Sequence, residues 1–218
     1  PVRLVDMPKI KEKAIIQLDT DEVAALLDYI ENYGNDLTGV KLYHYQKQKY
    51  RDIAIVTLLL GTGVRVSELV GLNISDIDFK NNGIRILRKG GNEMIVYFGE
   101  EVEKALRDYL EISRNAITPL SGHEDALFLS GQKKRISVDA VEKMVKKYCS
   151  AVSVKTITPH KLRSTYGTAL YRETGDIYLV ADVLGHADVN TTKKHYAKLS
   201  DERRRSASKA VVLREKLD

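Results

Sequence analysis

The spacing of the apolar residues changes inside one block of this chain, and that change is what most constrains the fold. On either side of residues 76–98 apolar residues recur at helical spacing, whereas inside the block apolar and polar residues alternate. Asn82-Gly83 and residues 88–92 are typical of the tight turns that join antiparallel strands. The sequence therefore predicts a mainly α protein with a small antiparallel β-sheet, an α+β fold.

Helices are predicted both before and after the sheet. Asp19 and Glu22 form the pattern of a capping box ahead of an amphipathic run that ends near Ile30. Residues 50–60 have the composition of a buried helix, and residues 33–48, rich in glycine and polar side chains, are interpreted as a loop. Further helices are expected over residues 64–69, 101–114, 137–150, 159–174, 176–184, 190–198 and from 200 onward.

Composition narrows the class of protein. The 218 residues are 43% hydrophobic and 30% charged, which is typical of one large or two small soluble globular domains. No apolar run is long enough to cross a bilayer and no signal peptide opens the chain, so we expect an intracellular protein. The net charge of +5 favours a polyanionic partner if the cations cluster. Cys149 is the single cysteine, which excludes an internal disulfide and favours a buried thiol.

The residues with the clearest chemical potential begin at Thr158. Thr158-Pro159 is typical of a helix start, since a threonine can cap the first amides and a proline fits the first helical position. His160 and Arg163 then lie three residues apart, on one face of the first turn. Free backbone amides and the helix dipole favour an anion there. The segment therefore predicts an oxyanion or phosphate site.

A possible nucleophile follows. His186 comes directly after Gly185, a residue that commonly ends a helix. Residues 190–192 offer capping side chains for another short helix, near whose end lies Tyr196, just after a basic pair. A phenol is a poor nucleophile at its ordinary pKa of about 10, but nearby positive charge lowers that value. Tyr196 is therefore a candidate nucleophile beside a candidate phosphate clamp.

Each of these motifs also has an ordinary structural explanation. A His-x-x-Arg pair is usually a surface feature, and one of twelve tyrosines is usually a packing residue. Arg65 and Glu68 form either a helical ion pair worth about 0.3–0.5 kcal/mol or a presented arginine oriented by its own glutamate. Lys89, at a hairpin tip, is on its own a solvated lysine. The basic runs at 133–135 and 143–147 are either solvated faces or contacts to a phosphate backbone.

Taken together and in order, these residues resemble the motifs of the tyrosine recombinase (phage integrase) family, with integrases of mobile elements and Xer-type recombinases the most similar members. The resemblance extends from about residue 18 to the end of the chain. It implies a linker remnant at 1–17, a catalytic domain at 18–199 and a C-terminal helix at 200–218. The residues to which it assigns catalytic roles are Arg65, Lys89, His160, Arg163, His186 and Tyr196.

The resemblance implies site-specific DNA cleavage and rejoining. In that reaction Tyr196 attacks a phosphodiester and remains joined to the DNA as a 3′-phosphotyrosine. The two arginines hold the non-bridging oxygens, the two histidines supply hydrogen bonds and proton handling, and Lys89 protonates the leaving 5′-oxygen. A covalent intermediate keeps the bond energy, so no ATP is implied. Because the cations of the site are preorganised, no metal or other cofactor is implied either.

The implied partner is double-stranded DNA, with a tetramer forming on DNA in the full-length protein and a monomer expected alone. The implied location is the bacterial cytoplasm, at the nucleoid when DNA is bound, with no membrane association. The C-terminal helix would dock on a neighbouring protomer or pack on its own domain. Two other functions stay open: a nicking-closing activity like that of a type IB topoisomerase, and a DNA-binding regulator that does not cut.

Overall fold

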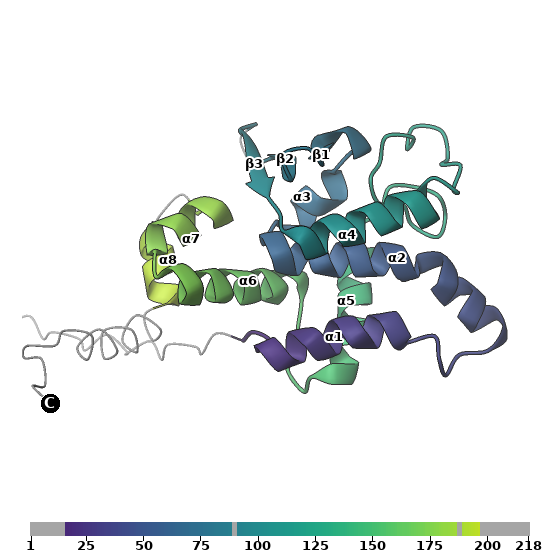
Figure 1. The fold of residues 1–218 in the computed structure, drawn as a ribbon, viewed down its shortest axis with the longest axis horizontal. Coiled ribbons are helices and arrows are strands. Elements are labelled where there is room, and N and C mark those ends of the chain that lie inside the picture. The colour runs from purple at the N-terminus through teal and green to yellow at the C-terminus, as the bar shows by residue number, and fades with distance from the viewer. Residues whose placement is uncertain (1–15, 89–90, 187–188, 197–218) are drawn as a thin grey trace, which may run out of the picture.

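The computed structural model describes residues 16–88, 91–186 and 189–196, and every structural statement below concerns these residues (Figure 1). The predicted linker, except for its last two residues, and the predicted C-terminal helix lie outside this part of the chain. Lys89, at the tip of the second hairpin, lies outside it as well.

The described chain is mainly helical, with helices before and after a small sheet in the sequence, as the spacing of apolar residues predicted, and the sheet lies at one edge of the molecule (Figure 1). The elements are α1 (Thr20–Asn32), α2 (Gly39–Thr62), α3 (Val66–Gly71), η1 (Ile74–Asp76), β1 (Ile77–Asp78), β2 (Gly83–Leu87), β3 (Glu93–Tyr97), α4 (Glu100–Asp108), η2 (Tyr109–Arg114), α5 (Val138–Val152), α6 (Pro159–Thr174), α7 (Ile177–Leu184) and α8 (Val189–His195). Here η1 is a 3-10 helix and η2 a π-helix. The predicted fold class is confirmed.

The sheet is antiparallel, with strand order β1-β2-β3. Ile84 of β2 pairs with Ile77 of β1 on one side and with Val96 of β3 on the other. Ile84 and Val96 are buried, whereas Leu87 and Tyr97 are exposed on the opposite face. This alternation is the pattern of a sheet that covers a core with one face only, which explains the period of two in the sequence.

The long helix α2 forms the centre of the molecule. Figure 1 shows α1 and α4 on opposite sides of it, and α6 packs against it as well. Leu58 and Leu59 of α2 are fully buried in the main apolar core, together with Cys149, whose thiol was predicted to be buried. Burial raises the pKa of that thiol to about 12, so it stays protonated and unreactive.

A second, smaller apolar cluster lies where α6, α7 and α8 meet. It consists of Tyr171, Val180, Leu184 and Tyr196. Because the first half of α6 contributes Leu162 to the main core and its second half contributes Tyr171 to the small one, this helix joins the two clusters. The motifs predicted to carry the chemistry therefore lie at the junction between them.

The loop predicted over residues 33–48 is wrong, because α2 already begins at Gly39. Its first turns are mainly polar and exposed, and the inward-facing Tyr45 holds them against α1. The Tyr45 hydroxyl donates to the backbone oxygens of Ile30 at 2.8 Å and Glu31 at 2.7 Å. The first turns of α2 are thus held by the single side chain of Tyr45. They lack the apolar stripe by which a helix is recognised in sequence.

Two predicted caps also differ from the structure. Thr158 occupies the N-cap position of α6, but its side chain makes no capping hydrogen bond, and Pro159 fills the first helical position as expected. Helix α8 begins at Val189, ahead of residues 190–192, so Thr192 lies inside the helix and its hydroxyl contacts His186 instead. Helix α5 does start as predicted, with the Ser137 hydroxyl accepting a hydrogen bond from a backbone amide.

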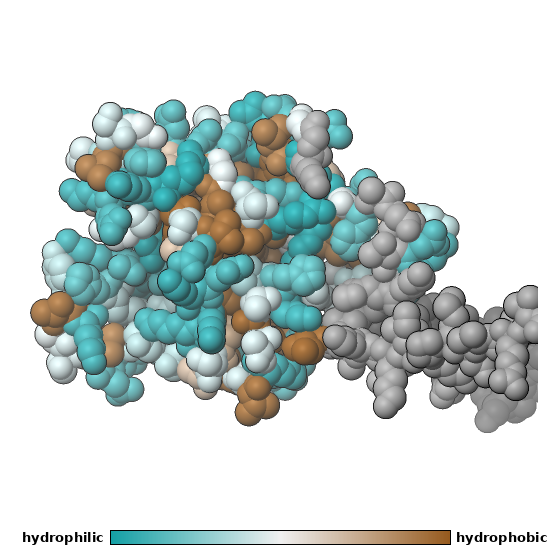
Figure 2. All heavy atoms as spheres, turned by 180° about the vertical axis from the view of Figure 1, so that it is seen from behind, coloured by the Kyte–Doolittle hydropathy of each residue, from teal (hydrophilic) through white to brown (hydrophobic). Residues whose placement is uncertain are grey.

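Polar side chains dominate the outer surface. Figure 2 shows hydrophilic residues over most of the face opposite to that of Figure 1, with an apolar area near its middle. Within the described ranges, no helix has the length and apolar character needed to cross a bilayer.

Candidate active site

The C-terminal end of α7 gathers three guanidinium groups from distant parts of the chain. The backbone carbonyls of residues 182–185 accept hydrogen bonds from them. The last carbonyls of a helix have no partner within it and carry the negative end of the helix dipole, so they attract cations. These groups belong to Arg65, Arg88 and Arg163.

Arg65 reaches α7 from the start of α3. Its Nη2 donates to the Gly185 carbonyl at 2.9 Å, and its Nη1 donates to Glu68 Oε1 at 2.7 Å. The backbone amide of Arg65 also donates to Glu68 Oε2, at 2.8 Å. The Glu68 side chain is only 5% exposed while that of Arg65 is 38% exposed, so the carboxylate is the fixed partner and orients the arginine. Both explanations offered by the sequence, an ion pair and a presented arginine, therefore describe the same contact.

Arg163 lies in the first turn of α6 and is almost fully buried. It donates to the backbone carbonyls of Gly63, just after α2, and Leu184, at the end of α7. Burial, together with the neighbouring Arg65, lowers its pKa to about 10. The side chain stays charged at neutral pH and joins the ends of three helices.

His160 lies one turn before Ser164 on the exposed side of α6. Partial burial of the ring, together with the cations Lys161, Arg163 and Arg65, keeps its pKa below the usual value. The ring is therefore neutral at neutral pH, where it can both donate and accept a hydrogen bond.

His186 follows the glycine that ends α7 and faces α8. Its Nδ1 lies 2.7 Å from Thr192 Oγ1, and Thr192 is fully buried. This contact ties the turn between α7 and α8 to the second of these helices. Since one ring nitrogen is engaged by the threonine, the orientation of the imidazole is set by its neighbour.

Tyr196, just after α8, is buried in the small apolar cluster and is 1% exposed. Its hydroxyl lies against Gly167 of α6, where an added Cβ would come within 2.3 Å of the phenol oxygen. Burial raises the pKa of Tyr196 to about 12, although Arg163 and a hydrogen bond with Thr168 act in the opposite direction. The phenol is thus neutral, one helical turn along α6 from Arg163.

Four of the predicted residues are therefore placed in two groups. Arg65, Arg163 and His186 converge on the last turn of α7 and the glycine after it, whereas Tyr196 lies behind them in the small cluster. Arg88, which the sequence placed only in a hairpin turn, joins the first group. No sequence pattern singled it out, because its partners are backbone carbonyls, which any residue supplies.

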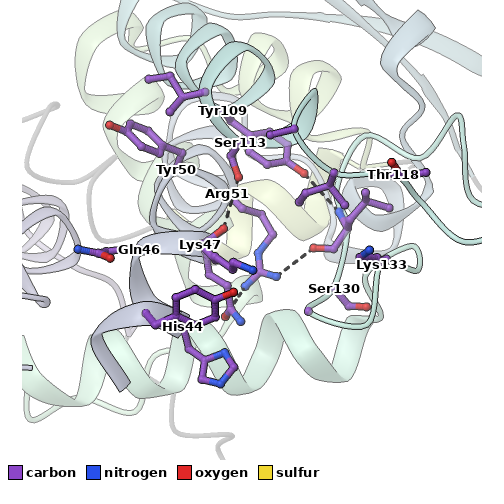
Figure 3. Close-up of a pocket in the computed structure, with 17 residues that line it drawn as sticks. His44, Gln46, Lys47, Tyr50, Arg51, Tyr109, Ser113, Thr118, Ser130 and Lys133 are labelled. Carbon is purple, nitrogen blue, oxygen red and sulfur yellow. Dashed lines mark hydrogen bonds between the residues drawn. The ribbon is translucent and has the colours of Figure 1, made fainter. Parts of the chain in front are cut away.

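A cavity of about 590 Å³ lies elsewhere, between the first half of α2, η2 and the turn at residues 129–133 (Figure 3). Arg51 lies at its wall and donates to the Leu129 carbonyl at 2.9 Å. None of the five predicted residues that the structure describes lines this cavity, so it is not the predicted site. Among the described residues, no three His, Cys, Asp or Glu side chains gather as ligands of a metal ion would.

Comparison with known proteins places the chain in a family. The model of the phage integrase family matches residues 17–203. Tyrosine recombinase XerS of Streptococcus uberis is 37% identical over 193 residues, which are 87% of this chain and 54% of that protein. Its counterpart in Streptococcus thermophilus is 39% identical over 188 residues, 84% of this chain and 52% of the relative. The chain thus spans about half the length of these curated relatives.

Solved structures of recombinases share the fold of this chain. The crystal structure of XerA recombinase superposes with a TM-score of 0.72 at 33% identity, covering 93% of this chain and 67% of that one. A structure of XerH site-specific recombinase shares the fold with a TM-score of 0.70 at 23% identity, covering 90% of this chain and 53% of the other. The chain therefore belongs to the phage integrase family, the tyrosine recombinases, and has the fold of their catalytic domain.

Proposed function

We propose that residues 18–199 form the catalytic domain of a site-specific DNA recombinase that cleaves and rejoins strands through a 3′-phosphotyrosyl intermediate. The observation that carries this proposal is the convergence of Arg65, Arg163 and His186 on one helix end, beside the helix that leads to Tyr196. Family membership supports the proposed reaction, and the convergence of cations supports a phosphate site at this helix end.

The arginines suit a phosphodiester because the site has more positive than negative charge. Arg65 lowers the pKa values of both Arg163 and Arg88, while Glu68 is the carboxylate that Arg65 contacts directly. Each guanidinium has five N–H donors, so donors beyond those used on α7 are available to non-bridging oxygens. An arriving phosphate relieves the repulsion and is held in a bidentate manner, which lysine does poorly.

In the proposed reaction the Tyr196 oxygen attacks phosphorus and the bond from phosphorus to the 5′-oxygen breaks. The phenol gives up its proton as the new bond forms, and the leaving 5′-oxygen gains one, for which Lys89 is the proposed donor. Buried against Gly167 with a pKa near 12, the phenol is unreactive. DNA binding must therefore move Tyr196 out of the small cluster and toward the arginines before cleavage.

Double-stranded DNA is the proposed partner, with assembly into a tetramer on DNA and a location at the nucleoid. Structures with the same fold include XerH bound to a palindromic difH substrate and the Tn1549 transposon integrase with circular intermediate DNA. Residues 200–218 are proposed to dock on a neighbouring protomer. Ending the chain after Leu199 should then weaken multimers on DNA in a mobility-shift assay, and unchanged assembly would instead favour packing on the same protomer.

Trapping the covalent intermediate tests the proposed function. A DNA duplex nicked next to the cleavage site loses its short fragment after attack, so the adduct accumulates and is seen on a denaturing gel. Wild type should form it, and Tyr196→Phe should bind DNA without forming it. Tyr171→Phe is the matched control, because its ring lies 5.7 Å from that of Tyr196 in the same cluster. An adduct with Tyr196→Phe at the wild-type level would reassign the nucleophile.

Further observations distinguish this function from the two others, a DNA-binding regulator that does not cut and a nicking-closing enzyme. A regulator that does not cut would give no adduct with any variant. A nicking-closing enzyme would give the adduct and relax supercoiled DNA, but would not exchange strands between two duplexes. Family membership favours exchange.

A further inference from the structure

Arg88 joins the end of the sheet to the end of α7. It follows β2, and its Nη2 donates to the Val183 carbonyl at 2.8 Å, with Nη1 at 3.4 Å from the Asp182 carbonyl. Its Nε is buried and has no hydrogen-bond partner among the described residues. A buried donor without a partner carries a desolvation penalty, so its retention calls for an explanation.

The guanidinium of Arg88 lies where a side chain at position 185 would otherwise be. A Cβ added to Gly185 would come within 1.8 Å of Arg88 Nη1, and Gly185 also has a left-handed φ of +60°. The carbonyl of the same glycine accepts from Arg65, and the next residue is His186. Arg88 therefore packs against the turn that connects two members of the candidate site.

The charge of Arg88 is not neutralised by a contacting carboxylate among the described residues. Burial lowers the pKa of Arg88 and Arg65 adds to the decrease, whereas the carboxylates of Glu68 and Asp182 oppose it only in part. Within the described ranges, no carboxylate lies within ion-pair distance of Arg88. Arg88 is half-buried and its guanidinium lies on the last carbonyls of α7, so its charge is directed at the end of this helix and not at a carboxylate.

We propose that Arg88 is a positioning residue for the phosphate site, holding the Gly185-His186 turn so that the imidazole and the carbonyl partner of Arg65 keep their places. The inference rests on the proposed function of the same site. It predicts that loss of Arg88 slows cleavage through His186 and leaves DNA affinity largely intact. The rival explanation is a simple link between the sheet and α7, which would affect folding alone.

The test measures the single-turnover rate of adduct formation on nicked DNA, with DNA affinity measured in parallel. Arg88→Gln should lower the rate by about tenfold to a hundredfold, the range expected when a reacting group is misplaced by about an ångström. Affinity should change by less than about threefold. Arg85→Gln is the matched control: it removes an exposed arginine from β2, the strand that Arg88 follows, one that pairs with Asp76, and should match wild type.

A double variant gives a result that a structural role does not. If Arg88 acts through His186, then Arg88→Gln should lower the rate by less than about threefold when His186→Ala is already present. Losses that multiply in full, or an Arg88→Gln rate at the wild-type level, would overturn the inference.

Two further results separate failure of the variant from failure of the inference. If circular dichroism shows Arg88→Gln to be unfolded, Arg88→Lys replaces it, alone and combined with His186→Ala. Lysine keeps the charge but cannot reach both carbonyls. If wild type itself forms no adduct, the proposed function fails and this inference fails with it. If wild type forms the adduct but the rate losses of Arg88→Gln and His186→Ala multiply in full in the double variant, only this inference fails.

Discussion

At the scale of single residues, Gly167 creates the space that the Tyr196 hydroxyl occupies. A glycine inside a helix costs about 0.5–1 kcal/mol relative to alanine. Here it permits a contact that a methyl group would block, because an added Cβ would lie 2.3 Å from the phenol oxygen and 2.8 Å from Leu184 Cδ1. The buried position of Tyr196, the proposed nucleophile, thus depends on the missing side chain of Gly167.

Gly167→Ala should therefore destabilise the fold by about 1–3 kcal/mol despite the higher helix propensity of alanine, because the phenol must be displaced. Gly71→Ala is the control, since an added Cβ there meets nothing within 4 Å. Urea unfolding measures the free energy of unfolding of both variants. A Gly167→Ala variant as stable as wild type would show that the phenol is not held in this position.

The raised pKa of Tyr196 predicts a dependence of stability on pH. Its folded pKa is about 12 against an unfolded value of about 10, so the folded state favours the neutral phenol. The raised pKa changes the free energy of unfolding with pH. Its contribution to stability is fully present below about pH 10 and is lost as pH rises through the folded-state pKa near 12. Urea midpoints between pH 8 and 11 should fall less steeply for Tyr196→Phe than for wild type; parallel curves would contradict the assigned burial.

Sequence motifs alone nominated Arg65, His160, Arg163, His186 and Tyr196 as site residues, and their catalytic roles stay predictions. It did not place Arg88 in the site, since hydrogen bonds to backbone carbonyls leave no pattern in side-chain identity. Nor did it show that Tyr196 is buried, because the cluster around it comes from three helices whose packing no local pattern encodes.

At the scale of elements, Glu22 fastens α1 to the loop after α5. Its carboxylate accepts from Lys155 Nζ at 2.5 Å, from Ser153 Oγ at 2.8 Å and from the Asp19 amide at 2.9 Å. The hydrogen bond from Lys155 is the main reason that the pKa of Glu22 falls to about 2. The capping box was visible in the sequence, but the partner more than a hundred residues away was not.

Glu22→Gln should destabilise the protein by about 1–2 kcal/mol at neutral pH, a range set by charge-assisted hydrogen bonds with partly exposed partners. The folded pKa lies below the ordinary value, so this stability is present above about pH 4.5 and is lost as pH falls toward 2. The difference from wild type should therefore shrink between pH 5 and 3.

Glu103→Gln serves as the control for Glu22→Gln. Glu103 forms an ordinary surface pair with Arg107, four residues on in the same helix, and its loss should cost about 0.5 kcal/mol or less. A Glu22→Gln effect no larger than this would show that the contact to the loop contributes little.

At the scale of the whole molecule, α6 carries Arg163 near the main core and Gly167 and Tyr171 into the small cluster. A cluster with few buried side chains opens more readily than a large core, so α7 and α8 should be the part of the described chain that moves first. This agrees with the proposal that Tyr196 is held in the small cluster and leaves it on DNA binding.

Hydrogen exchange should show this difference directly. Amides of α7 and α8 should exchange faster than those of the second half of α2, whose side chains are almost all buried. Binding to nicked DNA should slow exchange at residues 182–186, where the arginines converge. Equal protection of α2 and α7 would contradict the two-cluster description.

The most direct test of the account is to identify the residue and the DNA end in the trapped adduct. Wild type is incubated with nicked DNA, the adduct is digested with protease and nuclease, and the remaining nucleotide-bearing peptide is sequenced by mass spectrometry. The account predicts a peptide in which Tyr196 carries the nucleotide through its 3′-phosphate. A nucleotide on any other side chain, or one joined through its 5′-phosphate, would contradict it.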